Sequence, residues 1–240
     1  MVKNIAHRGF KSQYPENTMI AFEKAIETKC HGIEFDVHLS KDGEVVIIHD
    51  ETLEGTTNGT GRVMDYTLQE LKELDASHKF HEKVGVQRIP TLREYFELVK
   101  DLDFLSNVEL KTGVYEYPGL EEKVYALIQE FSLEDKVLIS SFNHESLLRM
   151  KKIAKEIPCG MLFDTWTIHP EEYVKKQGME CYHPVAYSLR KDVVDALKKE
   201  GIKVHAWLGK HPVDYEKVIA MGIDGIITDY PDVISKILAE

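Results

Sequence analysis

Residues 33–39 read Ile-Glu-Phe-Asp-Val-His-Leu, with an apolar residue at every second position. This alternation is typical of a β-strand, in which successive side chains point to opposite faces. The apolar residues then share one face, which helices can cover. Glu34 and Asp36 share the other face. The stretch therefore predicts a strand that packs outward against helices and turns two carboxylates inward.

Strand-like and helix-like patterns alternate on both sides of this stretch. Strand patterns occupy residues 4–8, 33–39, 108–111, 137–142, 159–163, 180–184, 203–208 and 225–228. A first helix opens at Pro15-Glu16-Asn17-Thr18, and further helix patterns occupy residues 91–100, 120–131, 144–156, 170–177, 191–200, 213–221 and 232–239. Repeated strand–helix units of this length imply a parallel sheet. Eight such strands predict an α/β protein with a closed (β/α)8 TIM barrel.

A hairpin follows the second strand. Lys41-Asp42-Gly43 has the composition of a tight turn, and residues 44–49 form a second strand pattern. If Ser40 pairs with Gly43, continuing the same register places His49 opposite Glu34. We therefore expect His49 at the same edge of the sheet as the two carboxylates.

About forty residues between His49 and Thr91 show no strong periodicity and are rich in Thr, Gly and charge. A structureless loop of this length is unusual in a compact domain unless it is functional or forms a small subdomain. Residues 67–74 have the pattern of a short capped helix. We expect one barrel domain over residues 1–240, with residues 51–89 inserted at its mouth. A disordered excursion is the alternative.

The composition limits the partners. A net charge of −11 argues against nucleic acid or an anionic membrane surface. Cys30, Cys159 and Cys181 are far apart and form no CxxC pair, which favours free thiols in the core. The first residues enter a strand without a secretory pattern, and no apolar stretch approaches the roughly 20 residues that span a bilayer. We therefore expect a cytoplasmic protein without a membrane span, whose oligomeric state the sequence leaves open.

Charged groups end several of the predicted strands. Glu34 and Asp36 lie on the second strand, and Glu109 lies on the next parallel strand. The carboxyl ends of barrel strands converge on one mouth. Three carboxylates with open water positions are typical of Mg²⁺ or Ca²⁺, whereas Zn²⁺ prefers nitrogen and sulfur ligands. The sequence therefore predicts a site for one divalent cation.

Imidazole and cationic groups end the same strands. His7 and His49 are suited to proton transfer, and Arg8 and Lys111 are suited to binding an anion. Singly, each could be an ordinary polar group or ion pair, and Asn17 could be only a helix cap. Together they would place too much unpaired charge in one barrel mouth to have no role. This favours metal-assisted hydrolysis of a phosphodiester.

Other polar and aromatic residues carry weaker signals. Phe142 and Trp207 end two further strands and either line the pocket or pack in the core. The remaining histidines form no ligand-spaced motif, and we expect most of them on the surface or in loops; they are His31, His38, His78, His81, His144, His169, His183, His205 and His211. Ser140-Ser141 lacks the context of a serine nucleophile.

The ordered combination of motifs resembles the glycerophosphodiester phosphodiesterase family. The similar motifs are His7-Arg8-Gly9, Pro15-Glu16-Asn17-Thr18, Glu34-Phe35-Asp36-Val37, Lys41-Asp42-Gly43, Val46-Ile47-Ile48-His49-Asp50, Glu109-Leu110-Lys111 and the closing run from Gly222 to Pro231. The resemblance spans nearly the whole chain. It implies a TIM-barrel phosphodiesterase with a small insertion after the second strand, which hydrolyses glycerophosphodiesters to glycerol 3-phosphate and an alcohol such as choline, ethanolamine or glycerol.

The resemblance also implies roles for the site residues. By motif match, Glu34, Asp36 and Glu109 would hold the cation. His7 and His49 would be the general acid and base, in an order that the sequence does not assign. Arg8 would bind the phosphate, with Lys111 and Asn17 in support. The attacking group would be water or a neighbouring glycerol hydroxyl.

One departure concerns the end of the seventh parallel strand. The family often has Trp-Thr-Val-Asn there, whereas this chain has Trp207-Leu208-Gly209-Lys210. The aromatic residue is kept and the asparagine is not, so contacts to the substrate can differ. Two alternatives remain: a lysophospholipase D that acts on long acyl chains, and a non-catalytic protein that binds phosphate esters.

Overall fold

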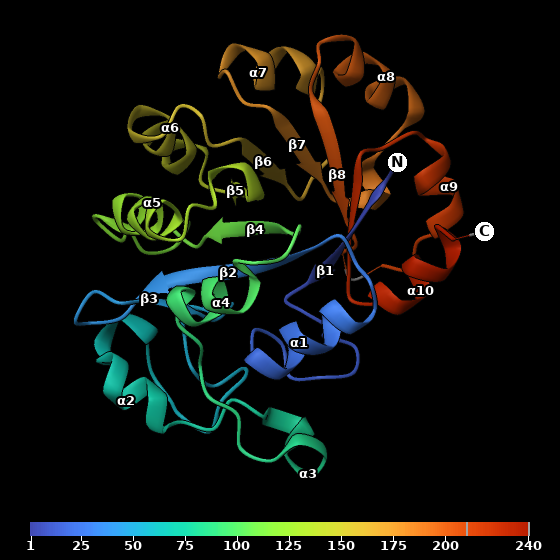
Figure 1. Cartoon of the computed structure of the whole chain (residues 1–240). Coiled ribbons are helices and arrows are strands. Elements are labelled where there is room, and N and C mark those ends of the chain that lie inside the picture. Colours follow the sequence, from blue (N-terminus) through green and yellow to red (C-terminus); the bar gives the residue numbers. More distant parts are fainter. Residues whose placement is uncertain (210, 240) are drawn as a thin grey trace.

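The computed structural model describes residues 1–209 and 211–239 and contains a closed barrel of parallel strands (Figure 1). Eight strands pair in the order β1-β2-β4-β5-β6-β7-β8-β9, and β9 returns to β1. Their bounds are β1 Lys3–His7, β2 Gly32–Leu39, β4 Leu105–Leu110, β5 Val137–Ser141, β6 Cys159–Phe163, β7 Cys181–Pro184, β8 Lys203–Trp207 and β9 Gly225–Thr228. The predicted (β/α)8 barrel is confirmed.

Helices surround the barrel (Figure 1). Their bounds are α1 Met19–Glu27, α2 Leu68–Glu73, α3 His81–Val84, α4 Leu92–Val99, α5 Leu120–Glu130, α6 His144–Ile153, α7 Pro170–Lys176, α8 Lys191–Lys199, α9 Tyr215–Ala220 and α10 Pro231–Ile237. Short 3₁₀ helices occupy Val63–Asp65, His78–Phe80, Glu134–Lys136 and Ala186–Ser188. The start of α4 is fixed by a capping box between Thr91 and Glu94, which satisfies two otherwise unpaired backbone N–H groups. Within the described residues no helix is long and apolar enough to cross a membrane.

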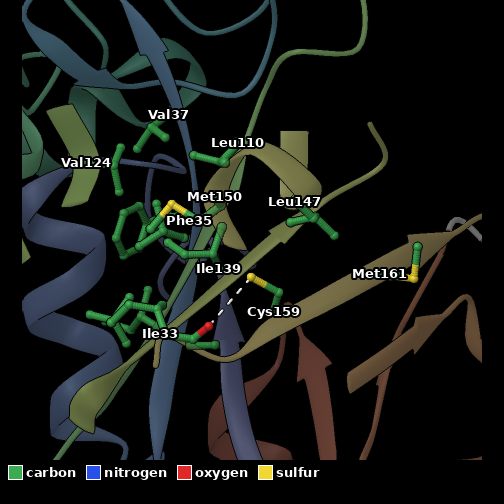
Figure 2. Close-up of a cluster of buried hydrophobic side chains, with 14 of the residues drawn as sticks. Ile33, Phe35, Val37, Leu110, Val124, Ile139, Leu147, Met150, Cys159 and Met161 are labelled. Atoms are coloured by element: carbon green, nitrogen blue, oxygen red, sulfur yellow. Dashed lines mark hydrogen bonds between the residues drawn. The ribbon is translucent and has the colours of Figure 1, made fainter. Parts of the chain in front are cut away.

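The apolar face of β2 points outward, as its alternation predicts. Ile33, Phe35 and Val37 are fully buried in the main core between the barrel and the helices. Figure 2 shows them in one cluster with side chains such as Val124 and Met150. Burial of apolar area at this interface supplies the main driving force for folding. It also fixes the inward direction of the intervening Glu34 and Asp36, because the side-chain period of a strand is two.

The hairpin differs from the prediction by one residue. Strand β3, Val45–Ile47, pairs antiparallel with β2, and Leu39 faces Val45. The Ser40 N–H donates to the Glu44 carbonyl (2.9 Å), so Lys41-Asp42-Gly43 forms a three-residue loop. Gly43 takes the left-handed conformation that such a loop requires (φ +83°). The predicted contact of Ser40 with Gly43 exists, since the Gly43 N–H donates to the Ser40 carbonyl (2.9 Å), but the strand register continues from Ser40 and Glu44, so the predicted register is wrong. Continued by two residues, the observed register sets His49 across from Phe35 instead of Glu34.

Strand β4 begins earlier than predicted. The prediction started at Val108, whereas β4 starts at Leu105 because it includes Ser106 and Asn107. Both polar residues are buried, and the Ser106 hydroxyl lies 3.2 Å from the Tyr95 hydroxyl in a side-chain hydrogen bond. The Asn107 amide has no such partner among the described residues. Buried polar residues of this kind hide a strand from a pattern that counts only apolar residues.

The segment of residues 51–89 lies outside the ring of barrel helices, on the side of α1 and α4 (Figure 1). It contains α2 and α3, and α2 confirms the short capped helix expected over residues 67–74. A second, smaller core joins it to the hairpin. This second core consists of Val46, Ile48, Leu53, Val63, Leu71, Ala76 and Ile89. Val46 in β3 and Ile48 directly after it therefore anchor the segment to the barrel.

Candidate active site

Three carboxylates converge inside the mouth of the barrel. Glu34 and Asp36 project inward from β2, and Glu109 projects from the neighbouring β4, where it pairs in register with Asp36. One oxygen of each lies within 4.8 Å of the others. All three residues are buried. The parallel register therefore brings together the acidic residues that the sequence predicted as a cluster.

The cluster carries more negative charge than its protein neighbours satisfy. Glu34 Oε2 and Asp36 Oδ1 are buried without a hydrogen-bond partner among the described residues. Burial, with the nearby Asp36 and Glu109, raises the pKa of Glu34 well above its ordinary value, and burial likewise raises the pKa of Glu109. Unpaired buried oxygens that repel one another are the donor set that a hard divalent cation satisfies. The residues present therefore fit such a cation.

Cations flank one side of the cluster. Arg8 Nε lies 3.3 Å from Asp36 Oδ2, and Lys111 Nζ lies 3.2 Å from Glu109 Oε1 and 3.8 Å from Asp36 Oδ1. Burial alone would raise the pKa of Asp36, but Arg8 and the other nearby cations hold it below its ordinary value. Asp36 therefore stays ionised, whereas the ionised forms of Glu34 and Glu109 would be stabilised by additional positive charge.

The loop after β1 shapes this flank. Arg8 and Asn17 both adopt left-handed backbone conformations (φ +54° and +55°), which cost energy for residues with a Cβ. The Arg8 N–H donates to the Glu34 carbonyl (2.7 Å), and the Asn17 N–H donates to the Arg8 carbonyl (3.0 Å). Glu16 accepts a hydrogen bond from the Arg8 guanidinium (2.7 Å). Two residues are thereby held in a strained form that aims both side chains at Asp36.

Asn17 does not cap the first helix. Thr18 is the N-cap of α1, and its hydroxyl accepts a hydrogen bond from the Ala21 N–H. The Asn17 amide instead donates to Asp36 Oδ2 (2.9 Å). Thr18 therefore caps the helix, and its neighbour Asn17 belongs to the site.

His7 ends β1 at the edge of the acidic cluster. Its Nδ1 lies 2.6 Å from Asp229 Oδ1, and its Nε2 lies 3.8 Å from Glu34 Oε2. Burial raises and the hydrogen bond with His7 lowers the pKa of Asp229, with a net decrease. The ionised carboxylate therefore accepts from Nδ1–H and leaves Nε2 directed at the cluster. Sequence reasoning missed this partner, because only barrel closure places the end of β9 beside β1.

His49 lies beside Lys111, next to Asp36 and Glu109. Its Nδ1 is 2.6 Å from Asp50 Oδ1, and Lys111 Nζ lies 3.3 Å from its Nε2. The His38 ring binds the His49 carbonyl (3.2 Å) and the Tyr117 hydroxyl (3.0 Å). His38 therefore holds the His49 backbone in place. The one-residue shift in register does not remove His49 from the site.

A cavity of about 220 Å³ opens above these groups. Its charged wall consists of His7, Arg8, Glu34, His49 and Glu109, and its apolar wall consists of Phe142, Leu162, Trp207 and Ile227. Phe142 and Trp207 stand edge to face, with ring centroids 6.0 Å apart. Both therefore line the cavity, as one of the two sequence interpretations held. The run Trp207-Leu208-Gly209-Lys210, which departs from the family pattern, ends at Lys210. This residue lies outside the described residues.

Three of the remaining histidines are not where the sequence analysis expected most of them. His38, His183 and His205 are buried, whereas the others are exposed or partly exposed. A histidine on an inward strand face cannot be told from a surface histidine by spacing alone. All three cysteines are free and buried, as expected.

Comparison with known proteins identifies the family. A family model described as the glycerophosphoryl diester phosphodiesterase family matches residues 7–233. The chain belongs to this family. The expectation of a phosphoric diester hydrolase, drawn from the charged strand ends and from the motif resemblance, is thereby confirmed.

Individual family members match over nearly their whole length. A glycerophosphodiester phosphodiesterase of Caldanaerobacter subterraneus is 46% identical over 228 residues, which cover 95% of this chain and 94% of the relative. A phosphodiesterase of Oleispira antarctica, solved in complex with the product sn-glycerol-3-phosphate, is 31% identical with a TM-score of 0.85, covering 98% of this chain and 96% of that one. A glycerophosphodiester phosphodiesterase of Thermotoga maritima is 32% identical with a TM-score of 0.77, covering 99% and 98%.

Proposed function

We propose that this family member hydrolyses small glycerophosphodiesters to glycerol 3-phosphate and an alcohol, with one divalent cation held by Glu34, Asp36 and Glu109. The observation that carries the proposal is the buried acidic cluster with two imidazoles beside it. The relative solved with bound sn-glycerol-3-phosphate supports the identity of the product.

The charged wall of the cavity suits a phosphate diester. A bound Mg²⁺ or Ca²⁺ would neutralise charge on the phosphate oxygens and stabilise its increase during the reaction. Arg8 supplies a planar donor group beside the cluster, and Lys111 supplies a second cation. Both keep their protons, because neighbouring carboxylates raise the pKa of each above its ordinary value against the effect of burial. They bind the anion and do not exchange protons with it.

The two histidines are positioned for the proton transfers. Each uses Nδ1 to contact a carboxylate, His7 that of Asp229 and His49 that of Asp50. His7 directs Nε2 at the cluster, whereas Lys111 contacts His49 Nε2 (3.3 Å) and would yield this nitrogen to the substrate. One removes a proton from the attacking oxygen, and the other protonates the departing alkoxide. Burial lowers the pKa of His7, which favours the neutral ring that accepts a proton. Acid–base assistance of this kind contributes about 10²–10⁴-fold.

The size of the cavity limits the substrate. Pockets for drug-sized ligands measure roughly 300–1,000 Å³, and this one measures about 220 Å³. A glycerol phosphate unit with a small head group suits that space better than a long acyl chain. The apolar wall of Phe142 and Trp207 would then contact the carbon atoms of the glycerol or of the head group.

A panel of glycerophosphodiesters with coupled detection of glycerol 3-phosphate tests the proposal. We expect turnover with Mg²⁺ or Ca²⁺, loss of turnover in excess EDTA and recovery when the cation is restored. A lysophospholipid in the same panel separates the alternative substrate class. Full activity in excess EDTA would reject the cation site, and absence of glycerol 3-phosphate from every diester would reject the substrate.

A further inference from the structure

A second cluster of metal-binding side chains lies inside the barrel, away from the acidic cluster. Cys181 and His183 lie on β7, and His205 lies on the neighbouring β8. One ligand atom of each lies within 4.8 Å of the others. Tyr182 lies between Cys181 and His183, and Val204 precedes His205. Both belong to the main core between the barrel and the helices, so the three cluster side chains face inward. This cluster has no role in the proposed reaction.

The two rings lack the partners that buried imidazoles normally have. His183 is fully buried, and neither of its ring nitrogens has a hydrogen-bond partner among the described residues. His205 Nδ1 is also buried without one, and the two rings stack with centroids 5.1 Å apart. Burial lowers the pKa of both rings, so both are neutral and each offers a lone pair. Leaving such groups unpaired is costly, which points to a ligand.

Neighbouring strands leave room for these rings. A Cβ added at Gly160 of β6 would lie 2.4 Å from His183 Nε2. A Cβ added at Gly225 of β9 would lie 2.8 Å from His205 Cδ2. Both distances are too short for real contacts, so only glycine at these positions accommodates the stacked pair. The pair is therefore built into the barrel by two further strands.

The cluster has an entry path. A cavity of about 490 Å³ opens at the amino ends of the strands, and Cys181 and His205 line it. Asp224 lines the same cavity and favours positive charge beside His205. Lys3 and Lys203 also line it and oppose a cation. The donor set of one sulfur and two nitrogens has to outweigh that opposition, which it does best for a metal that prefers such ligands.

We propose that Cys181, His183 and His205 form a second site, which binds a divalent metal of the zinc class. As the sulfur–metal bond forms, the Cys181 thiol gives its proton to solvent and binds as a thiolate. A fourth position faces the cavity and takes water. Because the amino face of a (β/α)8 barrel contributes to stability and the opposite face carries the chemistry, the metal stabilises the fold.

Cobalt(II) added to metal-free protein tests the site, because a cobalt–thiolate bond absorbs light strongly and the acidic cluster contains no sulfur. We expect a thiolate band that saturates by two equivalents, since the acidic cluster takes up cobalt without adding to the band. Cys181→Ser should abolish the band, and His205→Ala should weaken binding about tenfold or more. Zn²⁺ should raise the melting temperature of the original protein and not that of Cys181→Ser.

Cys159→Ser is the matched control. Cys159 is another buried thiol on the neighbouring strand β6, but it lies in the main core with Ile33 and Ile139 (Figure 2). Its variant should keep the cobalt band. Circular dichroism verifies that each variant is folded, and turnover with Mg²⁺ should be unchanged in all of them. No band with the original protein, or an undiminished band in both Cys181→Ser and His205→Ala, would overturn the proposal.

Discussion

His7, beside Glu34, and His49, beside Lys111, share one local arrangement at the acidic cluster. In each, a carboxylate 2.6 Å from Nδ1 fixes the ring and leaves Nε2 free of that contact. The partners come from different distances along the chain, since Asp50 is adjacent to His49 and Asp229 is 222 residues from His7. The same chemistry is therefore assembled once by local sequence and once by closure of the barrel.

His7→Ala and His49→Ala should each lower kcat by about 10²–10⁴-fold, because each removes one proton-transfer group. The melting temperature should change little, since both rings are partly exposed. Steady-state kinetics and thermal melts measure the two effects. His81→Ala is the matched control: its Nδ1 also contacts a carboxylate, that of Asp75 at 2.8 Å, but on α3 outside the barrel. Near-normal kcat in either site variant would contradict the assignment.

The sequence alone predicts the acidic cluster but not the residues that position the two histidines beside it. Glu34 and Asp36 could be placed on one face from their spacing, and the parallel pairing of β2 with β4 adds Glu109. Asp229 and His38 could not be assigned a role in this way. Their roles depend on contacts between residues far apart in the chain, and a sequence pattern reports only neighbours.

At the scale of elements, the β1–α1 loop is the most constrained part of the site. Asn17→Gly and Asn17→Ala both remove the hydrogen bond to Asp36, but only glycine adopts the left-handed backbone without strain. We expect both variants to lose activity and Asn17→Ala to be less stable than Asn17→Gly by about 1 kcal/mol. Urea unfolding and kinetics measure the two effects. Equal stability of the pair would show that the loop backbone carries no strain.

The segment of residues 51–89 is held by a partly exposed carboxylate. Asp75 Oδ1 accepts hydrogen bonds from the Ser77 and Gln87 N–H groups (2.9 and 3.1 Å), and Oδ2 contacts His81. Burial acts to raise the pKa of Asp75, but the hydrogen bonds together lower it by more. The pKa of Asp75 in the folded protein therefore lies below its value in the unfolded chain. The ionised form therefore stabilises the fold above about pH 4, and this contribution is lost as the pH falls.

Asp75→Asn should consequently be less stable than the original protein near neutral pH, and the difference should shrink below about pH 4. Urea unfolding at a series of pH values measures it. Glu97→Gln, a change at an exposed carboxylate of α4, controls for a general effect of removing charge. A stability difference that stays constant down to about pH 3 would contradict the role of the Asp75 charge.

The bounds of a strand were predictable from the sequence where one of its faces is apolar. They were less predictable where polar residues are buried, and the register of the hairpin depended on its turn. The outward face of β2 fixed that strand, whereas Ser106 and Asn107 concealed the start of β4. The hairpin register failed by one residue because the sequence Lys41-Asp42-Gly43 suits both a two-residue and a three-residue loop. Hydrogen bonds from Ser40 and Leu68 to Asp42 select the longer loop, and those partners are invisible to a local pattern.

At the scale of the whole molecule, the barrel follows from repetition, since eight strand–helix units that place their helices on one face of a parallel sheet bury the other face by closing. The segment of residues 51–89 breaks that repetition and has its own small core, which shares Val46 and Ile48 with the hairpin that carries His49. Lys83 Nζ also donates to the Gln13 carbonyl in the β1–α1 loop (2.8 Å). The segment therefore touches two of the elements that supply site residues.

Because the second core is separate from the main core, it should open without the barrel. Leu71 is fully buried there, so Leu71→Ala should cost about 2–5 kcal/mol within that unit. Amide hydrogen exchange should then rise across residues 51–89 and stay slow in β5 to β9, while activity falls through loss of the His49 position. Leu147→Ala, in the main core of Figure 2, should instead raise exchange throughout the barrel. If Leu71→Ala raised exchange equally in all strands, the two cores would unfold as one cooperative unit, and a separately opening segment would be excluded.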